Sequence, residues 1–205
     1  MIKSVANPDY FIGCRESRVV LVNNSDPDVN SLCRLRIRHG LYGTGTVSLQ
    51  HDTSGKYLYR ALPDSSNNEY ITVISSGNSD TTIEDQLRSS FNIIDGIALY
   101  ADTQKYDSIS IQCSPIKSEI NSREYKYISV DMNNSSIIAK SMANESKMQQ
   151  MQTYVLVDYN DYVAMSESSN NKISKPDSEF TIPKPTPGVS TPDMLARIGI
   201  NSNNN

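Results

Sequence analysis

The chain holds few residues whose types and spacing could support catalysis. Its two histidines are His39 and His51, and His51 is followed directly by Asp52. Neighbours in a hairpin turn point in different directions, so this pair is not expected to relay a proton. The sequence contains no GxSxG, HExxH or GxxxxGK[ST] motif, which mark serine hydrolases, zinc peptidases and phosphate-binding loops. We therefore expect no enzymatic activity, no catalytic residue and no cofactor.

The cysteines Cys14, Cys33 and Cys113 are odd in number, form no CxxC pair and have no histidine nearby in the sequence. Disulfide frameworks and zinc sites both need paired ligands at short, regular spacing. The sequence therefore predicts three buried free thiols and no metal site.

The residues favour binding over catalysis. The chain has 12 tyrosines and no tryptophan. A flat tyrosine ring can lie against the C–H face of a sugar while polar side chains bond its hydroxyl groups. Tyrosine is also a good strand residue, so half or more of these rings are expected to fill strand positions. The candidate carbohydrate contacts are His51, Asp52, Tyr57 and Tyr59.

Basic residues are spread over the whole chain, whose net charge is −4. The nearest thing to a basic patch is the alternation of Arg34, Arg36 and Arg38 along one predicted strand. Nucleic-acid binding usually needs a concentrated basic face, and three arginines at strand spacing are typical of a solvated strand face. No nucleic-acid partner is predicted.

The elements that would position these side chains are short strands, in a pattern that restarts near residues 2, 47 and 109. A threefold repeat of four strands predicts an all-β fold, a β-trefoil, although a jelly-roll sandwich also fits short strands with turns. The strands are predicted near residues 2–5, 10–13, 19–22 and 32–38, then 47–50, 57–60, 70–74 and 91–94, then 109–112, 125–130, 136–140 and 153–157. The repeats cover about 1–45, 46–107 and 108–162.

Helical patterns are short in this sequence. No segment keeps a 3.6-residue apolar period for three turns, which argues against a parallel α/β fold. Residues 82–88 could make a single helical turn, because Thr82 can cap it and the acidic Glu84 and Asp85 follow.

Residues 163–205 are rich in Ser, Asn and Pro and form a predicted C-terminal arm. Residues 182–187 alternate with proline, which is typical of extended polyproline. A short helix is predicted near 191–198, too short to be stable alone in water. Its apolar face would dock on a partner. The candidate docking residues are Ile182, Met194, Leu195 and Ile198.

The first third of the chain resembles the AbfB-type domain, the arabinofuran-binding β-trefoil module attached to arabinofuranosidases. The resemblance implies a β-trefoil, and it implies furanose binding in pockets built from a histidine and an aspartate of each repeat. Here His51 and Asp52 offer that pair, and Tyr59 with Arg60 stands where the family often has a histidine-containing segment. The segments that carry the resemblance are 4–12, 18–21, 35–41, 47–50 and 55–60.

Two functions stay open on the sequence. The first is a non-catalytic structural or assembly protein that docks, through its C-terminal arm, on protein partners in a larger complex such as a virion or a cellular scaffold. The alternative is a carbohydrate-binding module or lectin. Because no leader and no apolar run of membrane-spanning length is seen, an intracellular or virion-associated location without membrane insertion is expected.

Overall fold

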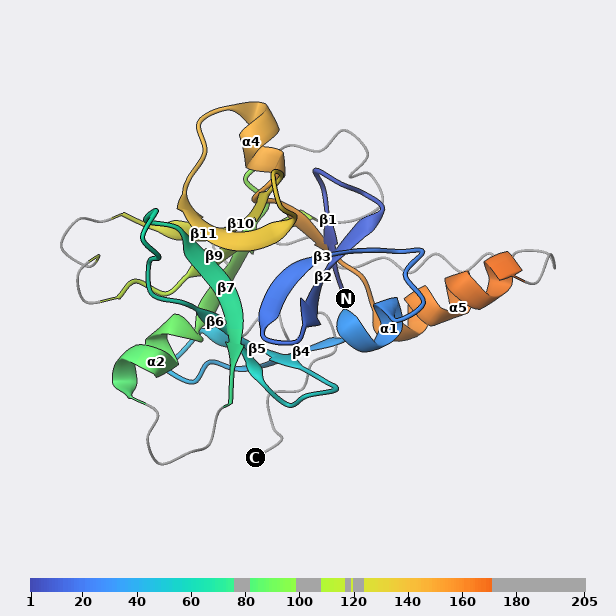
Figure 1. Ribbon diagram of the computed structural model, residues 1–205, viewed down its shortest axis with the longest axis horizontal. Helices are drawn as coiled ribbons and strands as arrows, with labels where there is room; N and C mark the ends of the chain where they lie inside the picture. Colours follow the sequence, from blue (N-terminus) through green and yellow to red (C-terminus); the bar gives the residue numbers. More distant parts are fainter. Residues whose placement is uncertain (76–81, 99–107, 117–118, 120–123, 171–205) are drawn as a thin grey trace.

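The structure is a computed structural model, and it describes residues 1–75, 82–98, 108–116, 119 and 124–170. The fold is all-β, with twelve strands in one continuous antiparallel sheet and short helices outside it (Figure 1). The strands are β1 (Ile2–Ser4), β2 (Tyr10–Arg15), β3 (Arg18–Asn23), β4 (Leu35–His39), β5 (Val47–His51), β6 (Tyr57–Arg60), β7 (Glu69–Ile74), β8 (Phe91–Asp95), β9 (Ser108–Cys113), β10 (Lys126–Asp131), β11 (Ser136–Ser141) and β12 (Tyr154–Leu156).

Ten of these strands close into a barrel. Their order is β11-β3-β2-β1-β12-β9-β8-β5-β6-β7, and β7 pairs back with β11 at Tyr70–Ile138 and Glu69–Ala139. The other two strands attach to this ring: β10 forms a hairpin with β11, and β4 pairs with β5. Among the described strands, only β4 keeps a free side, because it pairs with β5 alone.

The predicted β-trefoil of three four-stranded repeats is therefore wrong as a description of this chain. The strands join one closed barrel with two added strands and do not separate clearly into three equal sets of four. The single sheet also differs from the two facing sheets of a jelly roll. The strands themselves were predicted well, since all twelve lie within a few residues of their expected positions. Alternation tells which side chains face inward, but pairing partners depend on long-range contacts that alternation does not encode.

The barrel interior is filled by the inward-facing residues of the strands. In β6, for example, Leu58 is buried while its neighbours Tyr57 and Tyr59 are partly exposed. Burying aliphatic side chains of this size stabilises the fold by about 1.5–3 kcal/mol each. The fully buried apolar residues of this core include Ile12, Leu49, Leu58, Ile71, Phe91, Ile111, Ile128, Ile137 and Tyr154.

A second, smaller cluster lies outside the barrel wall, between β2, β3 and the helices α1 (Val29–Leu32) and α5 (Tyr159–Asn170). The ring of Tyr162 meets Phe11 edge to face, with centroids 5.2 Å apart. Gly13 lets this layer approach closely, because a Cβ there would lie 2.7 Å from Cys33 Sγ. In Figure 1, α5 starts beside α1 and projects away from the barrel.

The prediction of buried free thiols is confirmed for Cys14, Cys33 and Cys113. Burial raises the pKa of each thiol to about 12. At neutral pH they are therefore protonated and poor nucleophiles.

The predicted helical turn is confirmed as α2 (Ile83–Arg88). Thr82 accepts a bond from the backbone N–H of Asp85, and the Asp85 side chain accepts one from the backbone N–H of Thr82. This reciprocal capping satisfies two N–H groups that the first turn would leave unpaired. A further short helix, α4 (Ser146–Gln150), follows β11 and was not predicted.

None of the helices in the described part of the chain is long and apolar enough to cross a membrane. The predicted helix near 191–198 and the candidate docking residues Ile182, Met194, Leu195 and Ile198 lie outside the described residues.

Candidate ligand-binding site

A row of polar side chains crosses three neighbouring strands on the outer face of the barrel. Gln50 of β5 pairs with Arg36 of β4 on one side and with Tyr57 of β6 on the other. Directly paired residues of antiparallel strands project from the same face of the sheet. The sheet thus places a guanidinium, an amide and an aromatic ring side by side.

Asp52 fixes the two arginines at one end of this face. Its Oδ2 lies 2.7 Å from Arg34 Nε, and its Oδ1 contacts Arg36 Nε. Its backbone N–H also donates to the carbonyl of Arg34 at 2.9 Å. Because Asp52 follows Gln50 by two residues, both side chains lie on the face that carries the arginines.

Gln50 fixes the third arginine and the following turn. Arg38 Nε donates to Gln50 Oε1 at 3.0 Å, and Gln50 Nε2 donates to the carbonyl of Gly55 at 2.9 Å. Gly55 has a φ of +68°, in the left-handed region that favours glycine. Both ends of the Gln50 amide are therefore bonded, which orients the amide between strand and turn.

Arg34 is held from outside the sheet as well. Its guanidinium carbon lies 4.5 Å from the ring centroid of Tyr159, the first residue of α5. Such cation–π contacts contribute about 0.5–1 kcal/mol at exposed sites. We call the six residues of this face the arginine strip: Arg34, Arg36, Arg38, Gln50, Asp52 and Tyr57.

The structure places His51 apart from the arginine strip. The imidazole is buried on the opposite side of β5, with Nδ1 2.8 Å from Ser54 Oγ and Nε2 2.9 Å from the carbonyl oxygen of Ser31. Both ring nitrogens are thus occupied in holding two loops together. The predicted neighbours His51 and Asp52 therefore lie on opposite faces of the sheet, as strand alternation requires.

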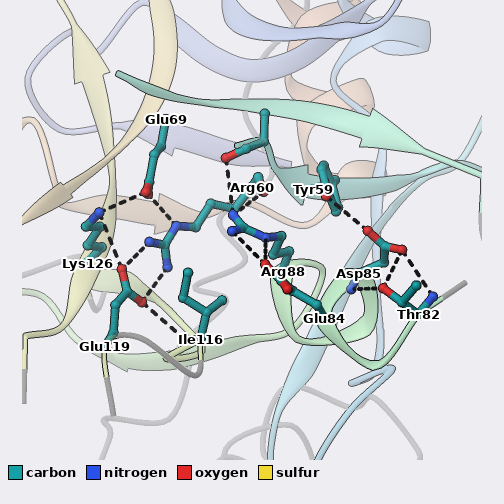
Figure 2. Close-up of polar contacts among 11 residues, drawn as sticks. Tyr59, Arg60, Glu69, Thr82, Glu84, Asp85, Arg88, Ile116, Glu119 and Lys126 are labelled. Atoms are coloured by element: carbon teal, nitrogen blue, oxygen red, sulfur yellow. Dashed lines mark hydrogen bonds and ion pairs between the residues drawn. The ribbon is translucent and has the colours of Figure 1, made fainter. Parts of the chain in front are cut away.

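Tyr59 projects from the same side of β6 as Tyr57 but meets a different element. Its hydroxyl donates to Asp85 Oδ1 at 3.1 Å, at the start of α2 (Figure 2). Burial and this hydrogen bond raise the pKa of Tyr59. The Tyr59 hydroxyl therefore anchors α2 to the barrel, and of the four candidate contacts only Asp52 and Tyr57 belong to the arginine strip.

Beside Tyr59, the chain buries a second group of charged side chains, centred on Arg60 (Figure 2). Arg60 Nε donates to Glu69 Oε2 at 2.5 Å, and both terminal nitrogens of Arg60 donate to Glu119. Lys126 Nζ donates to Glu69 Oε1 at 2.9 Å and lies 3.4 Å from Glu119 Oε1. We call Arg60, Glu69, Glu119 and Lys126 the ionic cluster.

The ionic cluster balances two positive charges with two negative ones. Burial raises the pKa of Glu69, but hydrogen bonds from Arg60 and Lys126 outweigh it and hold this pKa below its ordinary value of 4.5. The pKa of Glu119 is lowered in the same way, burial being outweighed by the hydrogen bonds from Arg60. Both carboxylates are therefore ionised at neutral pH. The ion pairs of the cluster link β6, β7 and β10.

The alternating arginines do form a solvated strand face, since Arg34, Arg36 and Arg38 are all exposed. Their neighbours Gln50 and Tyr159 were not predicted. The shared parity of Arg34, Arg36 and Arg38 was a usable signal. The sequence pattern does not reveal the strand register that places Arg36 beside Gln50, because this register depends on how the turn between β4 and β5 closes.

No protein-family model and no curated protein matches the chain. Solved structures match it at low identity. A mutant GH54 α-L-arabinofuranosidase soaked with 4-nitrophenyl α-L-arabinofuranoside is 10% identical, with a TM-score of 0.53. An arabinofuranosidase complexed with arabinofuranosyl-α-1,2-xylobiose is 9% identical, with a TM-score of 0.55.

Each match covers 77% of this chain and 30% of the other, so this chain spans less than a third of the length of those enzymes. At such low identity the likeness concerns the fold alone. The resemblance in the first third of the sequence and these structural matches agree on one point, which is that the chain has an AbfB-like, all-β fold.

Proposed function

We propose that this chain is a non-catalytic carbohydrate-binding module and that the arginine strip is its sugar-contacting surface. Its AbfB-like fold is shared with part of the arabinofuranosidases, which act on sugars. The competing hypothesis of an assembly protein rested on the C-terminal arm, and its docking residues lie outside the described part of the chain. The carbohydrate-binding hypothesis is therefore the better supported of the two.

The observation that carries the proposal is the register of Arg36, Gln50 and Tyr57 across three adjacent strands. Guanidinium and amide groups can bond sugar hydroxyls, and a tyrosine ring offers its face to the sugar C–H groups. The bonds from Asp52 and Gln50 hold the arginines in place before a ligand arrives. Less conformational entropy is then lost on binding.

The arginine strip is suited to binding and not to hydrolysis. Glycoside hydrolases use a pair of carboxylic groups on opposite sides of the scissile bond. The strip contains one carboxylate, Asp52, and both of its oxygens contact arginines. We therefore expect glycan binding without turnover.

The proposal is tested by screening the folded chain on an array of furanose and pyranose glycans, then measuring affinities by calorimetry. Replacing the strip tyrosine (Tyr57→Ala) is expected to weaken binding by roughly tenfold or more, a typical loss for a ring in a binding surface. The matched control is Tyr125→Ala, since Tyr125 has an exposed ring and precedes β10, outside the strip. A blank array, or equal losses for both variants, would overturn the proposal.

A further inference from the structure

We infer that the ligand of the arginine strip is an acidic saccharide, a glycan that carries carboxylate or sulfate groups. This inference rests on the proposed carbohydrate-binding function and narrows it to a substrate class.

The first support is the way the arginines are bonded. Arg34, Arg36 and Arg38 each meet the protein through Nε, the inner nitrogen of the guanidinium. Among the residues that the structure describes, none accepts a hydrogen bond from the terminal nitrogens of Arg38. By contrast, Arg60 and Arg88 in the interior use Nε and both terminal nitrogens. Within the described part of the chain, the terminal nitrogens of Arg38 are thus available, and that end of a guanidinium binds carboxylate or sulfate oxygens in pairs.

The second support is the charge of the strip. The strip carries three guanidiniums and one carboxylate, Asp52, which contacts only Arg34 and Arg36. Alternate residues of a strand stand about 6.8 Å apart on one face. Like charges at that spacing repel one another, and Asp52 offsets only part of the repulsion. A neutral sugar would leave the excess positive charge unmet, whereas an anionic ligand would neutralise it.

The third support is the shape of the surface. The three arginines lie in one row along β4. Among the described strands, β4 pairs with β5 alone. A linear chain with acidic groups at intervals can lie along that line and meet successive guanidiniums.

A nucleic acid would also bring regular negative charge, but the strip fits it less well. Single-stranded nucleic acids stack successive bases on several aromatic rings, and the strip has one ring along its edge, that of Tyr57.

The test compares four probes by calorimetry: oligogalacturonate for carboxylates, a heparin oligosaccharide for sulfates, a neutral arabino-oligosaccharide and single-stranded DNA. We expect one or both acidic glycans to bind at least tenfold tighter than the neutral one. Their affinity should fall when the salt concentration is raised from 50 to 500 mM, because salt screens exposed charges.

The variant Arg38→Gln should lower the affinity for the acidic glycan roughly tenfold, the loss expected for one charge-assisted hydrogen-bond pair. It should lower the neutral affinity by a clearly smaller factor, because a hydrogen bond to an uncharged hydroxyl is weaker than one to an anion. The conservative Arg38→Lys should restore only part of the loss, since lysine lacks the planar fork. The matched control is Arg18→Gln, which removes an exposed arginine from β3.

The outcomes separate the two proposals. Binding of neutral glycans alone, independent of salt and of Arg38→Gln, would overturn the acidic-saccharide inference and leave the carbohydrate-binding function standing. Binding of no glycan would overturn both. Single-stranded DNA bound as tightly as the acidic glycans would overturn the inference in favour of a general anion surface.

Discussion

The arginine strip and the ionic cluster both pair guanidinium groups with carboxylates, one on the outer face of β4 and β5 and the other inside the barrel. The side chain of Arg36 is 51% exposed and that of Arg60 is 1% exposed. In the cluster, all three nitrogens of the guanidinium donate to glutamates. In the strip, Arg34 and Arg36 contact Asp52 through Nε, and Arg38 donates through Nε to Gln50. The guanidinium of the ionic cluster is therefore inaccessible to a ligand, whereas those of the arginine strip are accessible.

The difference in burial sets what each region can contribute. Exposed ion pairs stabilise proteins by about 0–1 kcal/mol, whereas removing one partner of a buried pair costs about 3–5 kcal/mol. We therefore expect the ionic cluster to govern stability and the arginine strip to govern binding. The predictions below test that division, from the largest expected effect to the smallest.

The variant Arg60→Met should have the largest effect on stability. It leaves Glu69 and Glu119 buried without their main partner, so the free energy of unfolding should fall by about 3–5 kcal/mol. Urea denaturation followed by circular dichroism measures this change. A loss below about 1 kcal/mol would show that the ionic cluster contributes no more to stability than an exposed ion pair, which would contradict the proposed difference from the arginine strip.

Acid should weaken the fold through the same cluster. The pKa values of Glu69 and Glu119 are below the ordinary 4.5 in the folded chain, so the unfolded chain takes up protons first as the pH falls. The stabilisation is therefore complete well above pH 4.5 and is lost progressively below it. Unfolding midpoints measured from pH 6 to pH 3 should show this decline. A doubly neutral variant, Glu69→Gln with Glu119→Gln, should show a flatter profile, and an unchanged slope would contradict this assignment.

Tyr59→Phe should have an intermediate effect on stability and none on binding. It removes the hydroxyl that bonds Asp85 at the start of α2, which should cost about 0.5–1.5 kcal/mol. Glycan affinity should stay within about twofold of the parent chain, because a residue outside the binding surface contributes little. If Tyr59→Phe weakened glycan binding as much as Tyr57→Ala, the ligand site would extend to α2 and the division between the regions would fail.

Arg36→Gln should have the smallest effect on stability. Its ion pair with Asp52 is half-exposed on the arginine side, and Asp52 keeps Arg34 as a second partner, so the free energy of unfolding should change by less than about 1 kcal/mol. Thermal unfolding measures this beside Arg60→Met under identical conditions. A loss comparable to that of Arg60→Met would mean that the strip is a structural element of the fold.

The sequence predicted the strands more accurately than it predicted their arrangement. Alternation located β6 at its true bounds and the Thr82 cap located α2, since both signals are local. The assembly of the strands into one closed barrel depends on pairings such as Tyr70 with Ile138, which lie far apart in the chain. The expectation of three separate four-stranded repeats failed on those pairings.

Part of the candidate site could also be predicted from local signals in the sequence. Tyr57 and Asp52 were candidates because of their residue types, and both lie on the strip, where their role in binding stays a prediction. His51 was grouped with Asp52 because the two are adjacent, although adjacent strand residues face opposite ways. Arg60 and Glu69 gave no sign of burial in the sequence, since charged residues are rarely buried unless paired. Their partner Glu119 comes from a distant segment.

The most direct test of the central claim is to observe the arginine side chains while a glycan binds. In a titration followed by ¹H–¹⁵N NMR, the Nε–H signals of Arg36 and Arg38 should shift on adding the acidic oligosaccharide, and that of Arg60 should stay in place. Assignment follows from the signal that each Arg→Gln variant lacks. Shifts at Arg60 with none at Arg36 or Arg38 would contradict the account.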